Sequence, residues 1–182
     1  MKPMFTVHAG EYLTGLQIEK RFRKFHVWVP AKDTGVDLLV TNPAKQKQVG
    51  LQVKFSKDFL SPDNAPTFHK GLRACGWWTL NRDKIKKSMA DFWVFVLYSF
   101  DDRNVQFLII PPAMLLRTLK RIHGNTKTFN VYFWVTSKNK CWEARDLNRS
   151  DQSLIAVHQY SNPSRDVTRF LNDWSTLKRR LS

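Results

Sequence analysis

Cysteine is scarce in this chain and is not arranged for chemistry. Cys75 and Cys141 are the only cysteines among 182 residues, and neither belongs to a Cys-x-x-Cys pair. This spacing excludes a disulfide framework and argues against a zinc cluster. We expect both thiols to be reduced and mostly buried.

Long apolar runs are absent as well. The first residues, Met-Lys-Pro-Met-Phe-Thr-Val-His, lack the apolar core of a signal peptide. No uninterrupted run reaches the ~18 apolar residues that a membrane-spanning helix needs. The sequence therefore predicts a cytoplasmic protein without a membrane partner.

Acidic residues are few relative to basic ones. The chain has 15 Asp and Glu against 30 Lys and Arg, a formal net charge of +15. Such an excess indicates nucleic acid or an anionic membrane as partner. Nucleic acid is favoured because no amphipathic basic helix with a large apolar face stands out.

Hydrophobic and aromatic residues, in contrast, are abundant. They make up 42% and 13% of the chain, with seven Trp and thirteen Phe, more than surface loops would hold. Most of them must be buried, and the length suits one folded domain. We expect a single α/β domain over residues 1–182, with a core at about 5–100 and additional strands and a C-terminal helix over 101–182.

The hydrophobic periodicity and the turn residues predict an order of helices and strands. The expected elements are a helix from an N-cap at Thr6 to about residue 24, strands over 25–29, 35–40 and 49–55, a loop over 56–70, a partly helical segment over 82–87, strands over 91–100 and 105–110, a helix over 111–122, strands over 129–135 and 140–144, and a last helix over 165–180. The strand over 91–100 is expected to be central and buried on both faces.

The second and third strands are expected to form a hairpin. If its turn is centred between Ala44 and Lys45, Asp37 lies opposite Gln52, because both are equally far from that point. Lys54 follows two residues later, on the same face as Gln52. The pattern therefore predicts that two oxygen-bearing side chains and a lysine lie together.

Glu11 occupies an apolar stripe of the first helix together with Gly15, Ile18 and Phe22. A lone ionised carboxylate is costly to bury, so Glu11 either reaches water at the rim or is held for a purpose. The solvent face of this helix is expected to comprise Gly10, Thr14, Gln17, Arg21 and Lys24.

The combination of Glu11, Asp37, Gln52 and Lys54 suits a metal-dependent phosphodiesterase. Side-chain oxygens hold Mg²⁺, and a lysine lies beside the attacked phosphate. We therefore take these four residues as the candidate catalytic set.

The order of a helix with Glu, then Gly-Val-Asp-Leu-Leu-Val, then Leu-Gln-Val-Lys-Phe resembles the PD-(D/E)XK nuclease superfamily over about residues 5–100. The resemblance implies a restriction-endonuclease-like core, with a central mixed sheet of about five or more strands flanked by helices. It implies that Asp37, Gln52 and the Val53 carbonyl bind Mg²⁺, which Mn²⁺ could replace. Glu11 would bind a second metal or orient water, and Lys54 would steady that water. Gln52 stands where most members carry a carboxylate, although some restriction and transposition nucleases use Gln-x-Lys.

The expected function is accordingly a Mg²⁺-dependent DNA endonuclease in restriction, repair or mobile-element processing. By analogy it would act as a homodimer or with a partner nuclease subunit. Two alternatives remain open: a non-catalytic nucleic-acid-binding module on the same fold, and a structural subunit of a nucleoprotein complex.

Further basic and aromatic residues are candidates for nucleic-acid contact. The expected phosphate contacts are Lys54, Arg82, Lys84, Lys86, Lys87, Arg117, Lys120 and Arg121. Trp77 and Trp78 could stack on bases, but core packing is the favoured interpretation. The five histidines share no ligand spacing and are expected to be structural or exposed.

Overall fold

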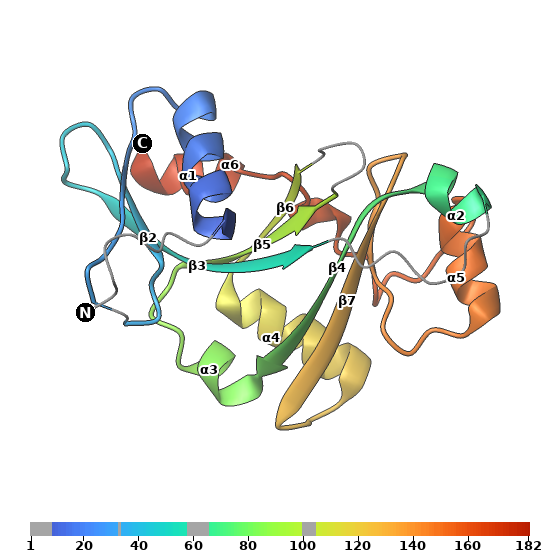
Figure 1. Ribbon diagram of the computed structural model, residues 1–182. Helices are drawn as coiled ribbons and strands as arrows, with labels where there is room; N and C mark the ends of the chain where they lie inside the picture. Colours follow the sequence, from blue (N-terminus) through green and yellow to red (C-terminus); the bar gives the residue numbers. More distant parts are fainter. Residues whose placement is uncertain (1–8, 33, 58–65, 100–104) are drawn as a thin grey trace.

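The protein is described by a computed structural model that covers residues 9–32, 34–57, 66–99 and 105–182. Thr6, the expected N-cap of the first helix, lies outside these residues. The elements in chain order are α1 (Ala9–Arg21), β1 (His26–Trp28), β2 (Leu38–Thr41), β3 (Gln48–Lys57), α2 (Pro66–Gly71), β4 (Leu72–Asn81), α3 (Arg82–Lys86), β5 (Phe92–Tyr98), β6 (Val105–Ile110), α4 (Pro112–His123), β7 (Thr128–Thr136), β8 (Cys141–Glu143), α5 (Arg149–Ala156), a 3-10 turn (Thr168–Phe170) and α6 (Ser175–Leu181) (Figure 1).

A five-stranded mixed sheet with the order β1-β2-β3-β5-β6 forms the centre of the fold. Strands β1, β2 and β3 are antiparallel, β5 runs parallel to β3, and β6 returns antiparallel to β5. Helices α1 and α6 cover one face of this sheet, whereas α4 and a second, three-stranded sheet cover the other (Figure 1). The expected mixed α/β fold with a mixed sheet of five strands is thus confirmed. The separate sheet β4-β7-β8 was not predicted.

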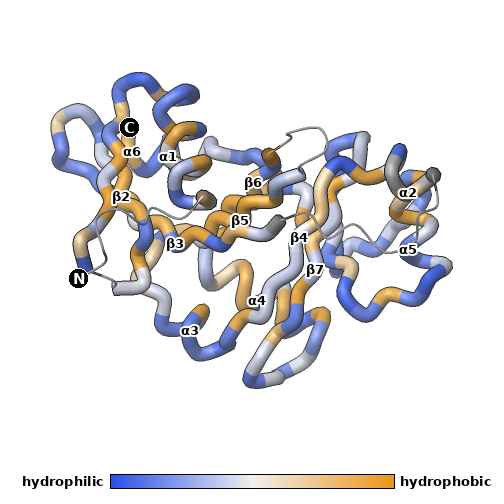
Figure 2. The backbone as a smooth tube through the Cα atoms, viewed as in Figure 1, coloured by the Kyte–Doolittle hydropathy of each residue, from blue (hydrophilic) through white to orange (hydrophobic). Residues whose placement is uncertain are grey.

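The two faces of β5 belong to two different hydrophobic clusters. Phe95 packs with the second sheet and α4, while Val94 and Val96 pack with α1 and α6. Figure 2 shows hydrophobic residues concentrated along β2, β3, β5 and β6, with hydrophilic segments outside them. The prediction of a strand buried on both faces is therefore confirmed.

Helix α1 turns a different face to the sheet than its sequence suggested. Gly10 and Thr14, expected in solvent, are buried together with Glu11, whereas Tyr12 is 62% exposed. A Cβ on Gly10 would lie 2.7 Å from the Phe55 Cβ, so the helix approaches β3 at a distance that only glycine allows. This close approach is what carries Glu11 inward.

The prediction of one continuous helix over residues 165–180 is wrong. Only the short 3-10 turn and α6 are helical there. Between them Leu171 bridges to Leu108 of β6, and the Asn172 N–H donates to the Phe107 carbonyl at 2.7 Å. Because this segment passes around the edge strand, its apolar residues reach two cores: Val167 enters one and Trp174 the other.

Other differences lie between the expected elements. The expected loop over residues 56–70 contains the end of β3 and the start of α2, and neither β4 nor α5 was predicted. Cys75 and Cys141 are free and buried, as expected. Burial raises the pKa of the Cys141 thiol, and the charges of Asp166 and Glu143 raise it further. In the described part of the chain, no helix is both long and apolar enough to cross a membrane.

Candidate functional site

One large cavity brings together residues that are far apart in the sequence. Its volume is about 940 Å³, and it opens between the β2–β3 hairpin on one side and β4 with α3 on the other. Its lining includes Glu11, Asp37, Gln52, Val53, Lys54, Thr79, Asn81, Lys84 and Lys87. All four residues of the candidate catalytic set therefore line the same cavity.

The hairpin has the predicted register. Leu38 pairs with Leu51 and Thr41 with Gln48, and the Asp37 N–H donates to the Leu51 carbonyl at 2.8 Å. The same alignment sets Asp37 opposite Gln52. Residues 42 and 47 close the turn symmetrically, since the Asn42 N–H donates to the Lys47 carbonyl, which explains why simple counting from the centre of the turn was sufficient.

The Asp37 carboxylate is held by two donors from β3. Its side chain is buried, with 7% of its surface exposed, and Oδ2 accepts a hydrogen bond from the Val53 backbone N–H at 2.7 Å. The Gln52 side-chain nitrogen Nε2 donates to the same oxygen. Hydrogen bonds to an ionised acceptor are among the stronger ones, so the carboxylate orientation is well defined. In this arrangement Gln52 presents its amide nitrogen to Asp37, and its oxygen would reach a shared cation only if the amide turned over.

Glu11 contributes a second buried carboxylate to the cavity, with 4% of its surface exposed. Together with Asp37, the Gln52 amide and the Val53 carbonyl it forms a set of oxygen donors, the kind that Mg²⁺ prefers. Among the described residues, however, no group of three or more His, Cys, Asp or Glu could hold a metal ion. The donor set fits a hard cation in type, with two carboxylates and neutral oxygens for the rest.

Lys54 extends over an aromatic ring in the wall of the cavity. Its Nζ lies 5.6 Å from the centroid of the Trp93 ring, and the Trp93 Nε1 donates to the Ser88 Oγ at 2.9 Å. A cation over an indole face is attracted to it, so Trp93 helps to define where the ammonium group lies. Neither Trp93 nor Ser88 was predicted as part of the site.

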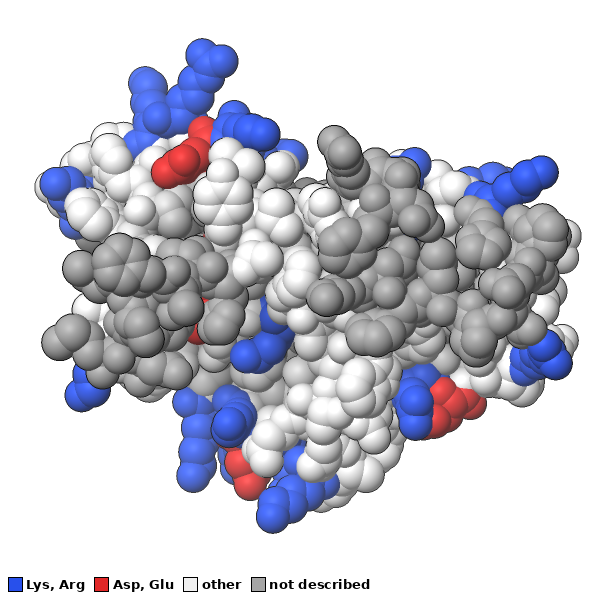
Figure 3. Space-filling model, in the orientation of Figure 1, with Lys and Arg blue, Asp and Glu red and all other residues white. Residues whose placement is uncertain are grey.

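The structure separates the predicted phosphate contacts into two groups. Lys54, Lys84 and Lys87 line the cavity. The other five do not: Arg82, Lys86, Arg117, Lys120 and Arg121. Figure 3 shows basic side chains gathered over α3 below the centre of the view, and a second group over α1.

Two of the arginines outside the cavity already have partners within the protein. Arg82 donates to Asn125 Oδ1 at 3.1 Å and forms an ion pair with Asp83, and Arg121 donates to the Ser164 carbonyl at 2.8 Å. Their guanidinium groups help to hold the loops around α4. The lysines of the cavity are thus better placed for phosphate than the arginines outside it.

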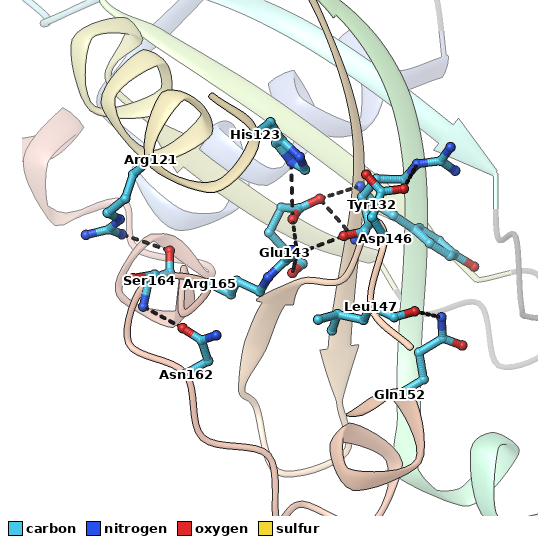
Figure 4. Close-up of polar contacts among 11 residues, drawn as sticks. Arg121, His123, Tyr132, Glu143, Asp146, Leu147, Gln152, Asn162, Ser164 and Arg165 are labelled. Carbon is cyan, nitrogen blue, oxygen red and sulfur yellow. Dashed lines mark hydrogen bonds and ion pairs between the residues drawn. The ribbon is translucent and has the colours of Figure 1, made fainter. Parts of the chain in front are cut away.

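A second cluster of buried charges centres on Glu143 of β8, which is fully buried (Figure 4). Its Oε2 lies 2.7 Å from Arg165 Nη1 and 3.3 Å from His123 Nε2. Its Oε1 accepts from the backbone N–H groups of Tyr132 and Arg145. With both oxygens occupied by protein groups, this cluster fastens the C-terminal segment to α4 and β8, as a structural histidine and ion pair would.

The cavity residues that the sequence did not reveal lie in the turn before β2, on β4, and from α3 to the start of β5. Thr79 and Asn81 lie at the end of β4, and the Asn81 side chain caps α3 by accepting from the backbone N–H groups of Asp83 and Lys84. The sequence signal that could have revealed β4 was the alternation of residue types around Trp77 and Trp78. Trp78 is in the core as expected, but Trp77 is 41% exposed.

Comparison of the chain with protein-family models, with curated proteins and with solved structures gives no match. The geometry and chemistry of the cavity are therefore the basis for inferring a function.

Proposed function

We propose that this protein is a Mg²⁺-dependent DNA endonuclease with a restriction-endonuclease-like core. The observation that carries the proposal is that one cavity is lined by all four candidate residues. Glu11 comes from α1, Asp37 directly precedes β2, and Gln52 and Lys54 lie on β3. The order of elements adds support. A helix, three antiparallel strands and a later strand parallel to β3 follow the core order of the PD-(D/E)XK superfamily, which the sequence resembles. The connection differs from the expected single helix, because α2, strand β4 of the second sheet and α3 all lie between β3 and β5.

The residues of the cavity have distinct roles in this proposal. Asp37, Gln52, the Val53 carbonyl and Glu11 would hold the ion, and Mn²⁺ would take the same oxygen ligands. A bound Mg²⁺ would supply positive charge that polarises the scissile phosphate and acidifies a water molecule. Lys54, held against Trp93, would place its ammonium group beside the negative charge that develops on the phosphate.

The charge of the molecule favours a polyanionic substrate. The net charge is +15, and Lys84 and Lys87 line the same cavity as the candidate ligands. An excess of one sign of charge over a molecule attracts ligands of the opposite sign, and these lysines place part of the excess beside the carboxylates of the cavity. We infer that the substrate is DNA, cut in a restriction, repair or mobile-element process. The protein would act in the cytoplasm, with a second subunit, identical or not, so that both strands are cut.

The decisive experiment is cleavage of a supercoiled plasmid with Mg²⁺, with Mn²⁺ and with excess EDTA. The expected result is nicking or linearisation with either metal and none in EDTA. Asp37→Asn is the matched variant, because its amide oxygen still accepts from the Val53 N–H while the charge is lost. Metal-independent cutting, or equal cutting by Asp37→Asn, would contradict the proposal.

A non-catalytic nucleic-acid-binding protein is the second candidate, and one observation favours it. The Gln52 amide donates to Asp37, so a protein donor already occupies the oxygen where a cation would bind. The same plasmid assay discriminates: this candidate retards DNA in a gel equally with Mg²⁺ and with EDTA, and leaves the plasmid intact.

A further inference from the structure

The outward face of the second sheet is covered at one end and uncovered at the other. At the first end α2 and α5 pack on it, with Phe68, Cys75 and Trp134 among the buried residues. Towards the other end three cross-strand pairs follow one another on that face: Trp77 with Tyr132, Thr79 with Asn130, and Asn81 with Thr128. We call these six residues the open face.

The open face has a composition that is unusual for bare sheet surface. None of its six side chains is charged, and Trp77 is 41% exposed. The Thr79 hydroxyl donates to Asn130 Oδ1 at 2.9 Å, so the two polar side chains are aligned across the strands. An exposed indole ring followed by amide and hydroxyl groups can stack on a base and hydrogen-bond to its edges.

The strand that carries Trp77 is held rigidly against the central sheet. The Trp77 backbone N–H donates to the Ser56 Oγ at 3.2 Å, and the next residue, Trp78, donates from Nε1 to the Phe55 carbonyl at 3.2 Å. Trp78 is buried, with Phe95 and Phe133 around it. A fixed backbone reduces the entropy lost when a partner packs on the exposed ring.

The open face is continuous with the candidate site. Thr79 and Asn81 belong to the open face and also line the cavity, where Lys84 and Lys87 follow them. Asp83, the acidic residue of the cavity wall nearest to them in sequence, forms an ion pair with Arg82 at 3.5 Å. A chain of phosphates that ran along this path would therefore meet Lys84 and Lys87 next to an aspartate that already has an arginine partner.

We propose that the open face binds a single strand of nucleic acid that leads into the cavity, with one base stacked on Trp77. Bases within a duplex already stack on their neighbours, so an indole ring finds a free base face only on an unpaired strand. The lysines of the cavity contact the backbone, and the hydroxyl and amide groups contact base edges. The proposal extends the proposed function by naming an unpaired strand beside the site, but it does not require cleavage.

The test is a binding titration in EDTA, where no cleavage can occur. The probe is a fluorescein-labelled thymidine oligonucleotide of about 20 nucleotides, longer than the roughly 4–16 nucleotides that a single-strand-binding OB-fold domain covers. Its fluorescence anisotropy gives the dissociation constant, and a duplex of the same length is the comparison. Wild type should bind the single strand more tightly, and Trp77→Ala should weaken that binding about tenfold, as expected when one base loses its stacking partner.

Two further variants separate stacking from other effects. Trp77→Phe keeps an aromatic ring and should retain most of the affinity. Trp28→Ala removes another exposed tryptophan, 46% exposed on β1, which lines no part of the cavity, and should bind as wild type does. Because tryptophan carries no charge, Trp77→Ala should also leave the salt dependence of binding unchanged.

Either of two results would overturn this inference: wild-type affinity of Trp77→Ala for the oligonucleotide, or an equal loss of single-strand and duplex binding. Both are independent of the cleavage assay. A protein that binds the oligonucleotide through Trp77 but never cuts would refute the endonuclease and leave the open face in place. A protein that cuts DNA, but whose affinity for the oligonucleotide does not depend on Trp77, would support the endonuclease and refute binding at the open face.

Discussion

At the scale of single residues, Asp37 has two functions that substitution can separate. Its carboxylate satisfies the buried Val53 N–H at 2.7 Å, which is structural, and carries a negative charge into the cavity, which the proposed chemistry needs. A buried N–H without an acceptor costs free energy, whereas an amide oxygen can replace a carboxylate oxygen as acceptor.

Asp37→Ala should therefore destabilise the protein by about 1–3 kcal/mol, while Asp37→Asn should cost less, because only the alanine leaves the Val53 N–H unsatisfied. Both variants should lose Mg²⁺-dependent cleavage. Urea unfolding gives the stabilities, and the plasmid assay gives the activity. Equal stability of the two variants would show that the hydrogen bond contributes little.

Substitutions of Gln52 distinguish a site that binds metal and cleaves from one that has lost both properties. In Gln52→Glu a second carboxylate would face Asp37, so the folded state should lose stability in EDTA and recover it as Mg²⁺ binds and stabilises the native form. We expect a larger Mg²⁺-dependent rise in Tm than in wild type, with cleavage retained. Gln52→Leu should show no such rise and no cleavage.

Thermal unfolding across a Mg²⁺ titration measures this effect without any turnover. A Gln52→Leu protein that cleaves normally would make Gln52 a bystander. A Tm that does not change with Mg²⁺ concentration in wild type or in either variant would contradict the metal site. It would not contradict nucleic-acid binding.

At the scale of elements, the position of α1 decides where Glu11 lies. Gly10 allows the helix to approach Phe55, and a Cβ there would sit 2.7 Å from the Phe55 Cβ. Gly15 on the same helix is less constrained, since its Cβ would lie 3.6 Å from Val27, an ordinary contact. The two glycines form a matched pair within one element.

Gly10→Ala should destabilise the protein by about 1–3 kcal/mol through overpacking and should lower cleavage, because α1 must move and Glu11 moves with it. Gly15→Ala should be neutral or more stable, by up to about 1 kcal/mol, since alanine is the better helix former. Urea midpoints and plasmid cleavage of both variants check this. Similar stabilities would mean that α1 is free to shift.

The elements that could be predicted from sequence are those with a clear local pattern of apolar and turn residues. The pairing of Asp37 with Gln52 follows from one symmetric turn, and β5 is marked by its continuous apolar run. Strand β4 could not be found in this way, because its exposed Trp77 breaks the alternation of apolar and polar residues. The part of the cavity wall that β4 supplies, Thr79, Leu80 and Asn81, was therefore missed.

The prediction of a continuous helix over residues 165–180 was wrong for a different reason. Its apolar residues recur at helical spacing, yet Val167 and Trp174 enter cores on opposite faces of the central sheet. A chain that passes around a sheet edge can produce the same spacing as a helix. Only the contact of Leu171 with β6, which no local pattern contains, separates the two cases.

At the scale of the whole molecule, the excess positive charge has to be divided between a general effect and contacts at the site. Any basic protein attracts DNA, and the +15 charge alone predicts salt-dependent binding. The structure singles out Lys84 and Lys87, which line the cavity, from lysines elsewhere. Lys138 and Lys140 are exposed at the opposite end of the β4–β7 ribbon, roughly 30 Å away at ~3.3 Å per residue.

These two pairs of lysines permit a test in which the net charge changes equally. For duplex DNA in EDTA, the logarithm of the binding constant should fall linearly with the logarithm of salt concentration, between roughly 50 and 200 mM. Replacing Lys84 and Lys87 together with Ala should reduce the slope by about 1.8, at ~0.9 for each phosphate that the protein no longer neutralises. The matched replacement of Lys138 and Lys140 should leave the slope close to wild type, because both lie several Debye lengths from the cavity. Equal changes in the two double variants would mean that DNA responds to the total charge and not to the cavity, and a flat salt response of the wild type would remove nucleic acid as the partner.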